Sequence, residues 1–162
     1  MSKYPVIIGR SELVDFPELL LTHVPAKADT GAYRSAIHVK NIKLSKKANT
    51  PVLSFDLLQD HPTTTYPRTV ETTNFTTANV ENSFGVSEER YAVILKIKLG
   101  TKIFKTEFTL TDRSVKTYPI LLGRKTLNKR FLVDPAKSHI DRKELKKKFN
   151  IDLQEDLEVI DP

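Results

Sequence analysis

The stretch from Tyr91 to Leu110, YAVILKIKLGTKIFKTEFTL, limits the possible folds more than any other part of the sequence. Every second residue from Val93 to Leu99 is apolar, and a similar alternation from Phe104 to Leu110 includes Thr106 among apolar residues. A period of two is typical of a strand with one buried face. Gly100-Thr101 between the two runs fits a two-residue turn with glycine first, so the stretch predicts a β-hairpin.

Other short apolar or alternating runs also predict strands, namely Pro5–Gly9, Ser35–Leu44, Pro51–Leu58 and the YPILL run before Gly123. The apolar parity changes inside Ser35–Leu44, which predicts a β-bulge near Asn41. The segment His61–Glu89 is rich in Thr and Asn. It predicts one or two exposed strands or a mobile hairpin.

Two helices are expected near the C-terminus, at Gly123–Arg130 and at Asp141–Phe149, with Asp141 as the N-cap of the second. The acidic stretch Asp152–Pro162 that follows predicts a surface tail. We find no internal repeat and no domain boundary before about residue 136. The sequence therefore predicts an all-β fold with short C-terminal helices.

The composition excludes several classes of function. The chain has 162 residues and a net charge of +6, and it contains no cysteine, so thiol chemistry, disulfides and thiolate metal sites are excluded. The first residues carry no uninterrupted apolar segment, and no run is long enough to cross a membrane, so we expect a cytoplasmic protein. The positive charge favours anionic partners, although surface lysines that keep the protein soluble explain it equally well.

The tripeptide Asp29-Thr30-Gly31 comes directly after an alternating apolar run. An aspartate at the end of a buried strand can face a cleft. The glycine lets its own N–H approach the carboxylate, and the Thr30 hydroxyl can brace the loop by donating to a carbonyl. Two such carboxylates held together share one proton, so that one acts as general base and the other as general acid. The same tripeptide is also ordinary turn chemistry, and one copy is a weak signal.

A second motif, Leu121-Leu122-Gly123-Arg124, follows much later in the chain. An Asp-Thr-Gly loop followed by this apolar-apolar-Gly-Arg pattern resembles the retropepsin-like aspartic proteases. The resemblance implies a single-lobed, closed β-barrel. It also implies that the second motif packs behind the loop, where Gly123 permits close approach. Asp29 then becomes the catalytic residue, supported by Thr30, Gly31, Leu122, Gly123 and Arg124.

A narrower resemblance covers Ile8 to Ser138, on the segments IGRSELVDFPEL, KADTGAYRSAIHV, SEERYAVILKIKLG, FTLTDRSVKTYPILLGRKTL and RFLVDPAKS. These segments resemble a small bacterial family often labelled ATP-dependent zinc protease, which is grouped with the retropepsin-like aspartic endopeptidases and accompanies RimK-type glutamate ligases. The resemblance implies a protease domain over residues 1–138 and a charged helix and tail over 139–162. It also implies an acidic polypeptide substrate, namely glutamate tails that the ligase adds to a ribosomal protein. Tyr33 departs from the family pattern, where a smaller or more polar residue is usual.

The zinc and ATP of that label find no support in the residues. There is no His-Glu-x-x-His, the four histidines are scattered without ligand spacing, and no Walker-type loop occurs, so we expect no metal and no cofactor. Ala32, Arg34 and His38 are the candidate substrate-facing residues. A lone strand histidine such as His38 is more often simply a satisfied or an exposed side chain.

Because only one Asp-Thr-Gly is present, the second carboxylate of a dyad would have to come from another chain. We therefore expect a C2 homodimer with Asp29 at the axis, and we expect His61–Glu89 to cover the cleft. One alternative is a non-catalytic adaptor of the same fold that regulates a glutamate ligase or a ribosomal component. A nucleic-acid-binding barrel is disfavoured, because the densest lysine run, Lys143–Lys148, has no interleaved aromatic residues.

Overall fold

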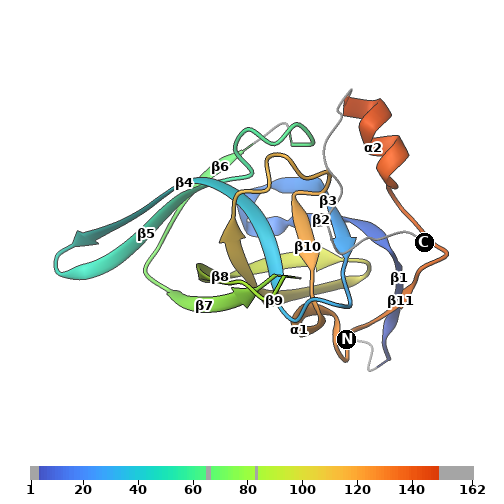
Figure 1. The fold of residues 1–162 in the computed structure, drawn as a ribbon, viewed down its shortest axis with the longest axis horizontal. Coiled ribbons are helices and arrows are strands. Elements are labelled where there is room, and N and C mark those ends of the chain that lie inside the picture. The colour runs from blue at the N-terminus through green and yellow to red at the C-terminus, as the bar shows by residue number, and fades with distance from the viewer. Residues whose placement is uncertain (1–3, 65–66, 83, 150–162) are drawn as a thin grey trace.

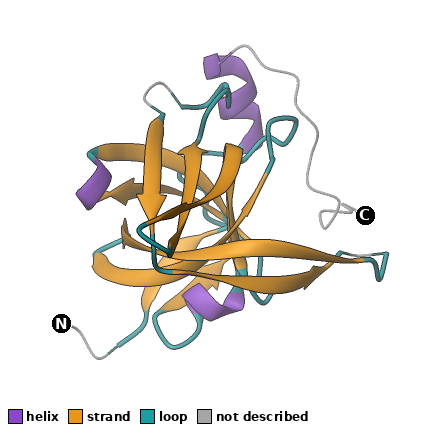
Figure 2. Ribbon diagram, turned by 90° about the vertical axis from the view of Figure 1, so that its left-hand side faces the viewer, coloured by secondary structure: helices purple, strands orange, loops and turns teal. Residues whose placement is uncertain are grey.

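The computed structural model describes residues 4–64, 67–82 and 84–149, and strands make up most of them (Figures 1 and 2). The strands are β1 (Val6–Gly9), β2 (Ser11–Phe16), β3 (Leu21–Ala28), β4 (Ser35–Lys47), β5 (Thr50–Leu57), β6 (Arg68–Thr72), β7 (Phe75–Glu81), β8 (Ser87–Leu99), β9 (Lys102–Thr111), β10 (Ile120–Leu122) and β11 (Phe131–Asp134). The helices are the 3₁₀ turn η1 (Pro17–Leu19), α1 (Arg124–Leu127) and α2 (Arg142–Phe149). The expected all-β class is confirmed.

A closed ring of strands forms the body of the molecule. The order is β10-β3-β2-β8-β9-β4, and β4 closes the ring because it also pairs with β10. β5 and β6 continue from β4, β7 pairs with β8, and β1 with β11 forms a separate parallel pair. The core contains side chains from strands around the ring, including Phe16, Ile37, Ile97, Phe108 and Leu122, all fully buried.

The predicted hairpin is present as β8 and β9. Ile97 lies opposite Phe104, and Leu99 lies opposite Lys102, so two residues make the turn. Gly100 has φ of 59°, a backbone conformation that favours glycine. The bulge in β4 is also confirmed, because Asn41 has positive φ and the β4–β5 register shifts between Lys40 and Lys43.

The segment His61–Glu89 contains two strands, but they do not pair with each other. β6 pairs with β5, whereas β7 pairs with the first half of β8. Two hairpins therefore project from the ring, β4–β5 toward the left of Figure 1 and β7–β8 toward the right of Figure 2. The tip of β7–β8 exposes Phe84 and Val86.

Both C-terminal helices are present, although α1 is shorter than predicted. Asp141 is the N-cap of α2, since its carboxylate accepts the Glu144 N–H at 2.8 Å. Leu145 on α2 is fully buried, and the Tyr118 hydroxyl donates to the Ile140 carbonyl at 2.7 Å, so the segment up to Phe149 packs on the body. The predicted acidic tail, Asp152–Pro162, lies outside the described residues.

Candidate functional site

The fold brings the two sequence motifs side by side. Asp29 directly follows β3, and β3 runs parallel to β10 with Ala28 opposite Leu122. The Asp29 N–H donates to the Leu122 carbonyl at 2.9 Å. β10 also pairs with β4, so the strand behind the loop has a neighbour on each side. The backbone of Asp29 is therefore held by β10, a strand that is itself paired on both sides.

The carboxylate of Asp29 is held through one oxygen only. Oδ1 accepts the Gly31 N–H at 3.1 Å, and a Cβ added at Gly31 would lie 3.3 Å from that oxygen. Oδ2 is buried and has no hydrogen-bond partner among the described residues, and the residue as a whole is 8% exposed. A buried polar atom left unpaired costs about 1–3 kcal/mol, so Oδ2 is an acceptor that the described part of the chain leaves unsatisfied.

Gly123 allows β10 and α1 to approach the loop. A Cβ at this position would lie 2.6 Å from both the carbonyl carbon and oxygen of Arg34, which is closer than real side chains come. Because the two segments are so close, the next two N–H groups reach the loop. Arg124 donates to the Ala32 carbonyl and Lys125 to the Tyr33 carbonyl, each at 2.8 Å. The start of α1 therefore satisfies the carbonyl groups of the Asp29 loop.

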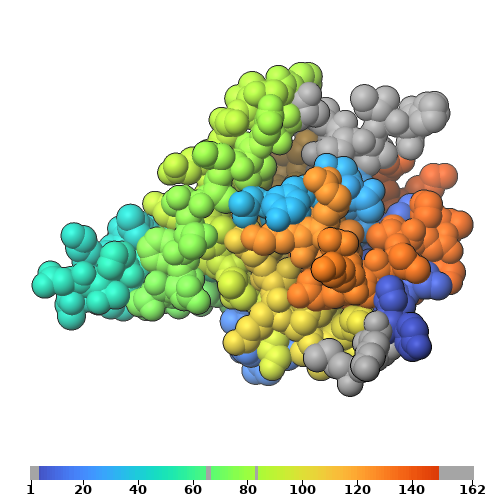
Figure 3. All heavy atoms as spheres, turned by 90° about the horizontal axis from the view of Figure 1, so that it is seen from below, coloured from blue at the N-terminus to red at the C-terminus, as the bar shows by residue number. Residues whose placement is uncertain are grey.

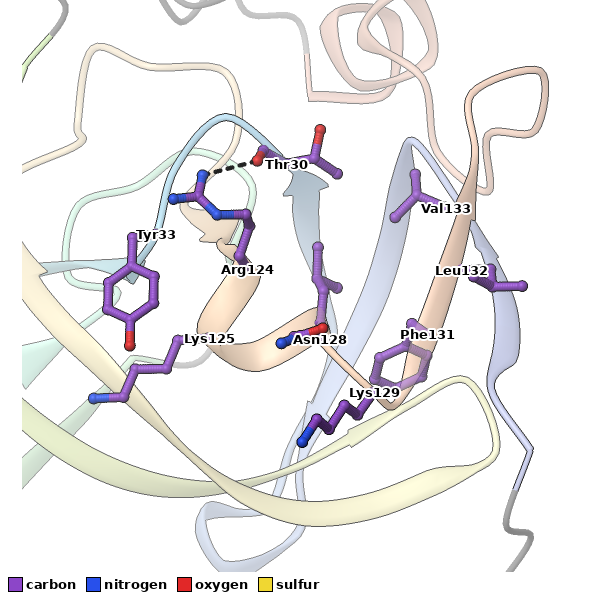
Figure 4. Close-up of a pocket in the computed structure, with 10 residues that line it drawn as sticks. Thr30, Tyr33, Arg124, Lys125, Asn128, Lys129, Phe131, Leu132 and Val133 are labelled. Carbon is purple, nitrogen blue, oxygen red and sulfur yellow. Dashed lines mark hydrogen bonds between the residues drawn. The ribbon is translucent and has the colours of Figure 1, made fainter.

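The side chain of Arg124 braces the same loop from outside. Its Nη1 donates to the Thr30 carbonyl at 3.0 Å (Figure 4). The same nitrogen also donates to the Gly31 carbonyl at 3.0 Å. The Thr30 hydroxyl was expected to brace the loop, but it makes no hydrogen bond within the described part of the chain. An arginine can hold two carbonyls at once because its guanidinium presents several fixed donors.

A cluster of buried hydroxyl groups that the residue pattern did not predict lies behind the loop. Ser35 accepts the Gly123 N–H at 3.0 Å and shares a hydrogen bond with Thr126, which in turn bonds Thr106 at 2.8 Å. Thr109 donates to the Ser35 carbonyl at 3.0 Å. The one signal in the sequence was Thr106, a polar residue on the apolar face of a strand. The cluster ties β4, β9 and α1 together behind Asp29.

Charged and aromatic side chains form the rim of the loop. Glu107 on β9 forms ion pairs with Arg34 and with Lys125, the second at 3.2 Å. Tyr33 is 54% exposed, and the guanidinium groups of Arg34 and Arg124 each lie 5.8 Å from its ring centre. Arg34 thus lies at the rim of the loop, with its charge partly neutralised by Glu107, and its contact with substrate stays a prediction.

His38 does not face a cleft, and this expectation is corrected. Its side chain is fully buried, with Nδ1 accepting the Arg113 N–H at 2.7 Å and Nε2 donating to the Gln59 carbonyl at 2.6 Å. The His61 ring lies 5.4 Å away and is also buried. Burial lowers the pKa of both rings, to about 4 for His61. The pair therefore ties the 58–64 and 112–118 loops to β4.

A groove of about 640 Å³ begins at Thr30 and runs along α1 to β11 (Figure 4). Tyr33 and Arg124 line one end, and Phe131 and Leu132 line the other. Leu132 lies opposite Ile7 in the β1–β11 pair, and both side chains are more than half exposed. An apolar surface therefore continues from the Asp29 loop to the paired N- and C-terminal strands.

Two kinds of feature are absent from the described residues, a cluster of metal ligands and a membrane-spanning helix. No three His, Asp or Glu side chains in residues 4–64, 67–82 and 84–149 come together as metal ligands. The helices of the same residues include none that is long and apolar enough to cross a membrane.

Several proteins with similar sequences share the name probable alpha-L-glutamate ligase. A segment of a Shewanella pealeana protein called probable alpha-L-glutamate ligase is 36% identical over 141 residues. Proteins with the same name from Desulfotalea psychrophila and Parasynechococcus marenigrum are 34% and 33% identical. The matches cover 80–85% of this chain but only 28–30% of those proteins, so the chain spans under a third of their length.

A solved structure is also similar. The crystal structure of a Legionella pneumophila protein of unknown function (DUF785) has a TM-score of 0.65 and 33% identity, covering 82% of this chain and 95% of that one. The family model described as the retropepsin-like aspartic endopeptidase RimB matches residues 7–144. That match includes both motifs of the site and most of the described structure. The chain therefore belongs to the RimB-like family of retropepsin-like proteins.

Proposed function

We propose that this chain is one half of an aspartic endopeptidase in which Asp29 residues from two copies form the catalytic dyad. The observation that carries the proposal is the Asp29 carboxylate, with one oxygen fixed by Gly31 and the other buried without a partner. A second carboxylate at close range would share a proton with that free oxygen, because two like charges cannot both ionise there.

The dyad would act on water and a peptide bond. The ionised carboxylate takes a proton from water as the water oxygen attacks the carbonyl carbon, while the protonated carboxyl donates to the carbonyl oxygen. As the tetrahedral intermediate collapses, one of its hydroxyl groups gives a proton to the ionised carboxylate, the C–N bond breaks, and the leaving nitrogen takes the proton of the other carboxyl. The dyad therefore ends with one proton, as it began. The Gly31 N–H and the Arg124 guanidinium keep the carboxylate and its loop in position throughout.

The apolar surface beside the loop supports pairing with a second copy. The groove along α1 begins at Thr30, where a two-fold partner bringing its own Asp29 would have to approach, and the exposed Ile7–Leu132 pair lies at the other end of this groove. A C2 contact uses the same patch on both chains, so one apolar patch is sufficient. We assign the cover of the cleft to the β7–β8 hairpin, whose exposed Phe84 and Val86 would be buried on closure.

Glutamate-tailed protein is the substrate class that we favour. Segments similar to this chain form part of longer proteins named as probable glutamate ligases, which suggests that the two activities work on the same polypeptide. The net charge of +6 would attract an acidic tail. The same relatives also favour a second candidate function, a non-catalytic adaptor that binds and regulates a ligase.

The deciding experiment combines mass and turnover. Light scattering over a wide concentration range measures whether the protein pairs, and a peptidase assay on a glutamate-tailed peptide compares the wild type with Asp29→Asn. A dimer whose turnover is abolished by Asp29→Asn, with a bell-shaped pH profile, supports the peptidase. A monomer without turnover at any pH supports the adaptor.

A further inference from the structure

The outer face of the β8–β9 hairpin carries three lysines that we call the lysine face: Lys96, Lys98 and Lys105. Lys96 lies directly opposite Lys105, and Lys98 lies opposite Ile103. None of the three makes an ion pair with an acidic group among the described residues, and Lys98 and Lys105 are exposed. Like charges directly opposite each other on a sheet are destabilising, so this arrangement gains nothing from folding itself.

Protection of a sheet edge does not account for these lysines. Lysines on exposed edge strands prevent edge-to-edge association, but β8 has neighbours along both edges, with β9 on one side and β7 and β2 on the other. The lysines stand on the face of the sheet instead. One acidic residue, Asp15, lies opposite Lys98 on β2, and its carboxylate accepts the His23 N–H.

The lysine face continues directly from the rim of the Asp29 loop. Glu107, which holds Arg34 and Lys125, is two residues from Lys105 on the same face of β9. Residues two apart on a strand are separated by about 7 Å, so the Lys98 row lies about 14 Å from Glu107. Figure 3 shows these strands in yellow on the same side of the molecule as the light-blue loop after Asp29 and the orange α1.

We infer that the lysine face is an exosite that holds the acidic tail of the substrate as the tail leaves the Asp29 loop past Arg34. The inference rests on the proposed peptidase function and names the surface that would select its substrate. The distance from Glu107 to the Lys98 row matches about four residues of extended peptide. The exposed apolar residues among the lysines are Ile94 and Ile103, which offer no aromatic surface for stacking bases, so a glutamate-rich peptide fits better than a nucleic acid.

Binding can be tested without turnover. In the Asp29→Asn background, a fluorescent hexaglutamate peptide is titrated against the protein with the normal lysine face and against Lys96→Gln/Lys105→Gln. The matched control is Lys43→Gln/Lys46→Gln, which removes the same charge from the β4–β5 hairpin that projects away from the body (Figure 1). We expect affinity to fall about tenfold in the Lys96/Lys105 variant at low salt, and to change less than about twofold in the control.

The outcomes separate the exosite from the peptidase. Equal binding by both double variants, or no binding of hexaglutamate at all, overturns the exosite whether or not the protein cleaves peptides. Tighter binding of a single-stranded oligonucleotide of equal charge through the same two lysines also overturns it. Lysine-dependent binding of hexaglutamate, with wild-type turnover absent, retains the docking surface and refutes the proposed peptidase function.

Discussion

Replacing Gly123 with alanine tests the central packing contact of the site. The added Cβ would lie 2.6 Å from the carbonyl carbon and oxygen of Arg34 and 2.8 Å from the Tyr33 oxygen, and all three atoms belong to the backbone. No flexible side chain can move aside, so the loop after Asp29 or the start of α1 must shift. Overpacking of this kind costs about 3 kcal/mol.

One opposing effect reduces the cost. Gly123 has φ of −88° and ψ of 175°, an extended conformation that alanine adopts without strain. Alanine therefore lowers the conformational entropy of the unfolded chain, which stabilises the protein by about 1 kcal/mol. The net expectation is a loss of about 2 kcal/mol in the free energy of unfolding. Peptidase turnover and hexaglutamate binding should also fall under conditions where the variant is still fully folded, since the displaced loop carries Asp29 and Arg34.

Urea unfolding followed by far-UV circular dichroism measures the loss of stability, and Gly31→Ala is the matched control. There the added Cβ would meet only the Asp29 Oδ1, at 3.3 Å, so we expect less than about 1 kcal/mol of destabilisation. The reasoning is refuted when Gly123→Ala unfolds within about 0.5 kcal/mol of the wild type, or when Gly31→Ala is the more damaging of the two.

Three further predictions concern single side chains. Asp29→Asn should reduce peptidase turnover at least about a thousandfold. The unfolding midpoint in urea should move little, since the amide oxygen can still accept the Gly31 N–H. Turnover equal to the wild type excludes Asp29 as the catalytic base. Arg124→Met and Arg124→Lys should both lower kcat by about tenfold or more. Neither side chain has a guanidinium group that can hold both the Thr30 and Gly31 carbonyls. Full activity of the lysine variant contradicts this role. Burial lowers the pKa of His61 from 6.5 to about 4, so the unfolded chain binds the proton more readily, and stability is present above pH 6.5 and lost as pH falls toward 4. Urea unfolding at pH 7 and pH 4.5 should differ by about 2 kcal/mol in the wild type through His61 and by clearly less in His61→Gln, and a wild type equally stable at both pH values would contradict the prediction.

Local features of the sequence were sufficient for the elements whose signals lie within a few residues. The alternation around Gly100-Thr101 predicted β8 and β9 with the correct turn, and the change of parity at Asn41 predicted the bulge in β4. Asp141 predicted the start of α2 through its capping carboxylate. In each case the determining interaction is between near neighbours or within one hairpin, so the residue pattern alone specifies it.

Strands whose partners are distant in the sequence were harder to predict. β2 and β11 were not identified, because each is a short run whose stability comes from pairing with β3 or β1 rather than from its own pattern. For the segment His61–Glu89 the sequence predicted one or two strands without their bounds. Nothing in the segment indicated that β6 and β7 would pair with different neighbours. Strand pairing across the ring is a tertiary choice that β propensity does not encode.

The candidate site divides in the same way. The sequence by itself drew attention to Asp29-Thr30-Gly31 through its carboxylate and turn chemistry, whereas Leu122-Gly123-Arg124 was singled out through the resemblance to the retropepsin-like proteases. Only the tertiary structure decided that Arg124, and not the Thr30 hydroxyl, braces the loop, and that His38 is buried against His61 instead of facing a cleft. The buried hydroxyl cluster and the lysine face likewise depend on which strands become neighbours. Hydrogen bonds, burial and electrostatic fields depend on distance in space, which the order of residues fixes only after the chain has folded.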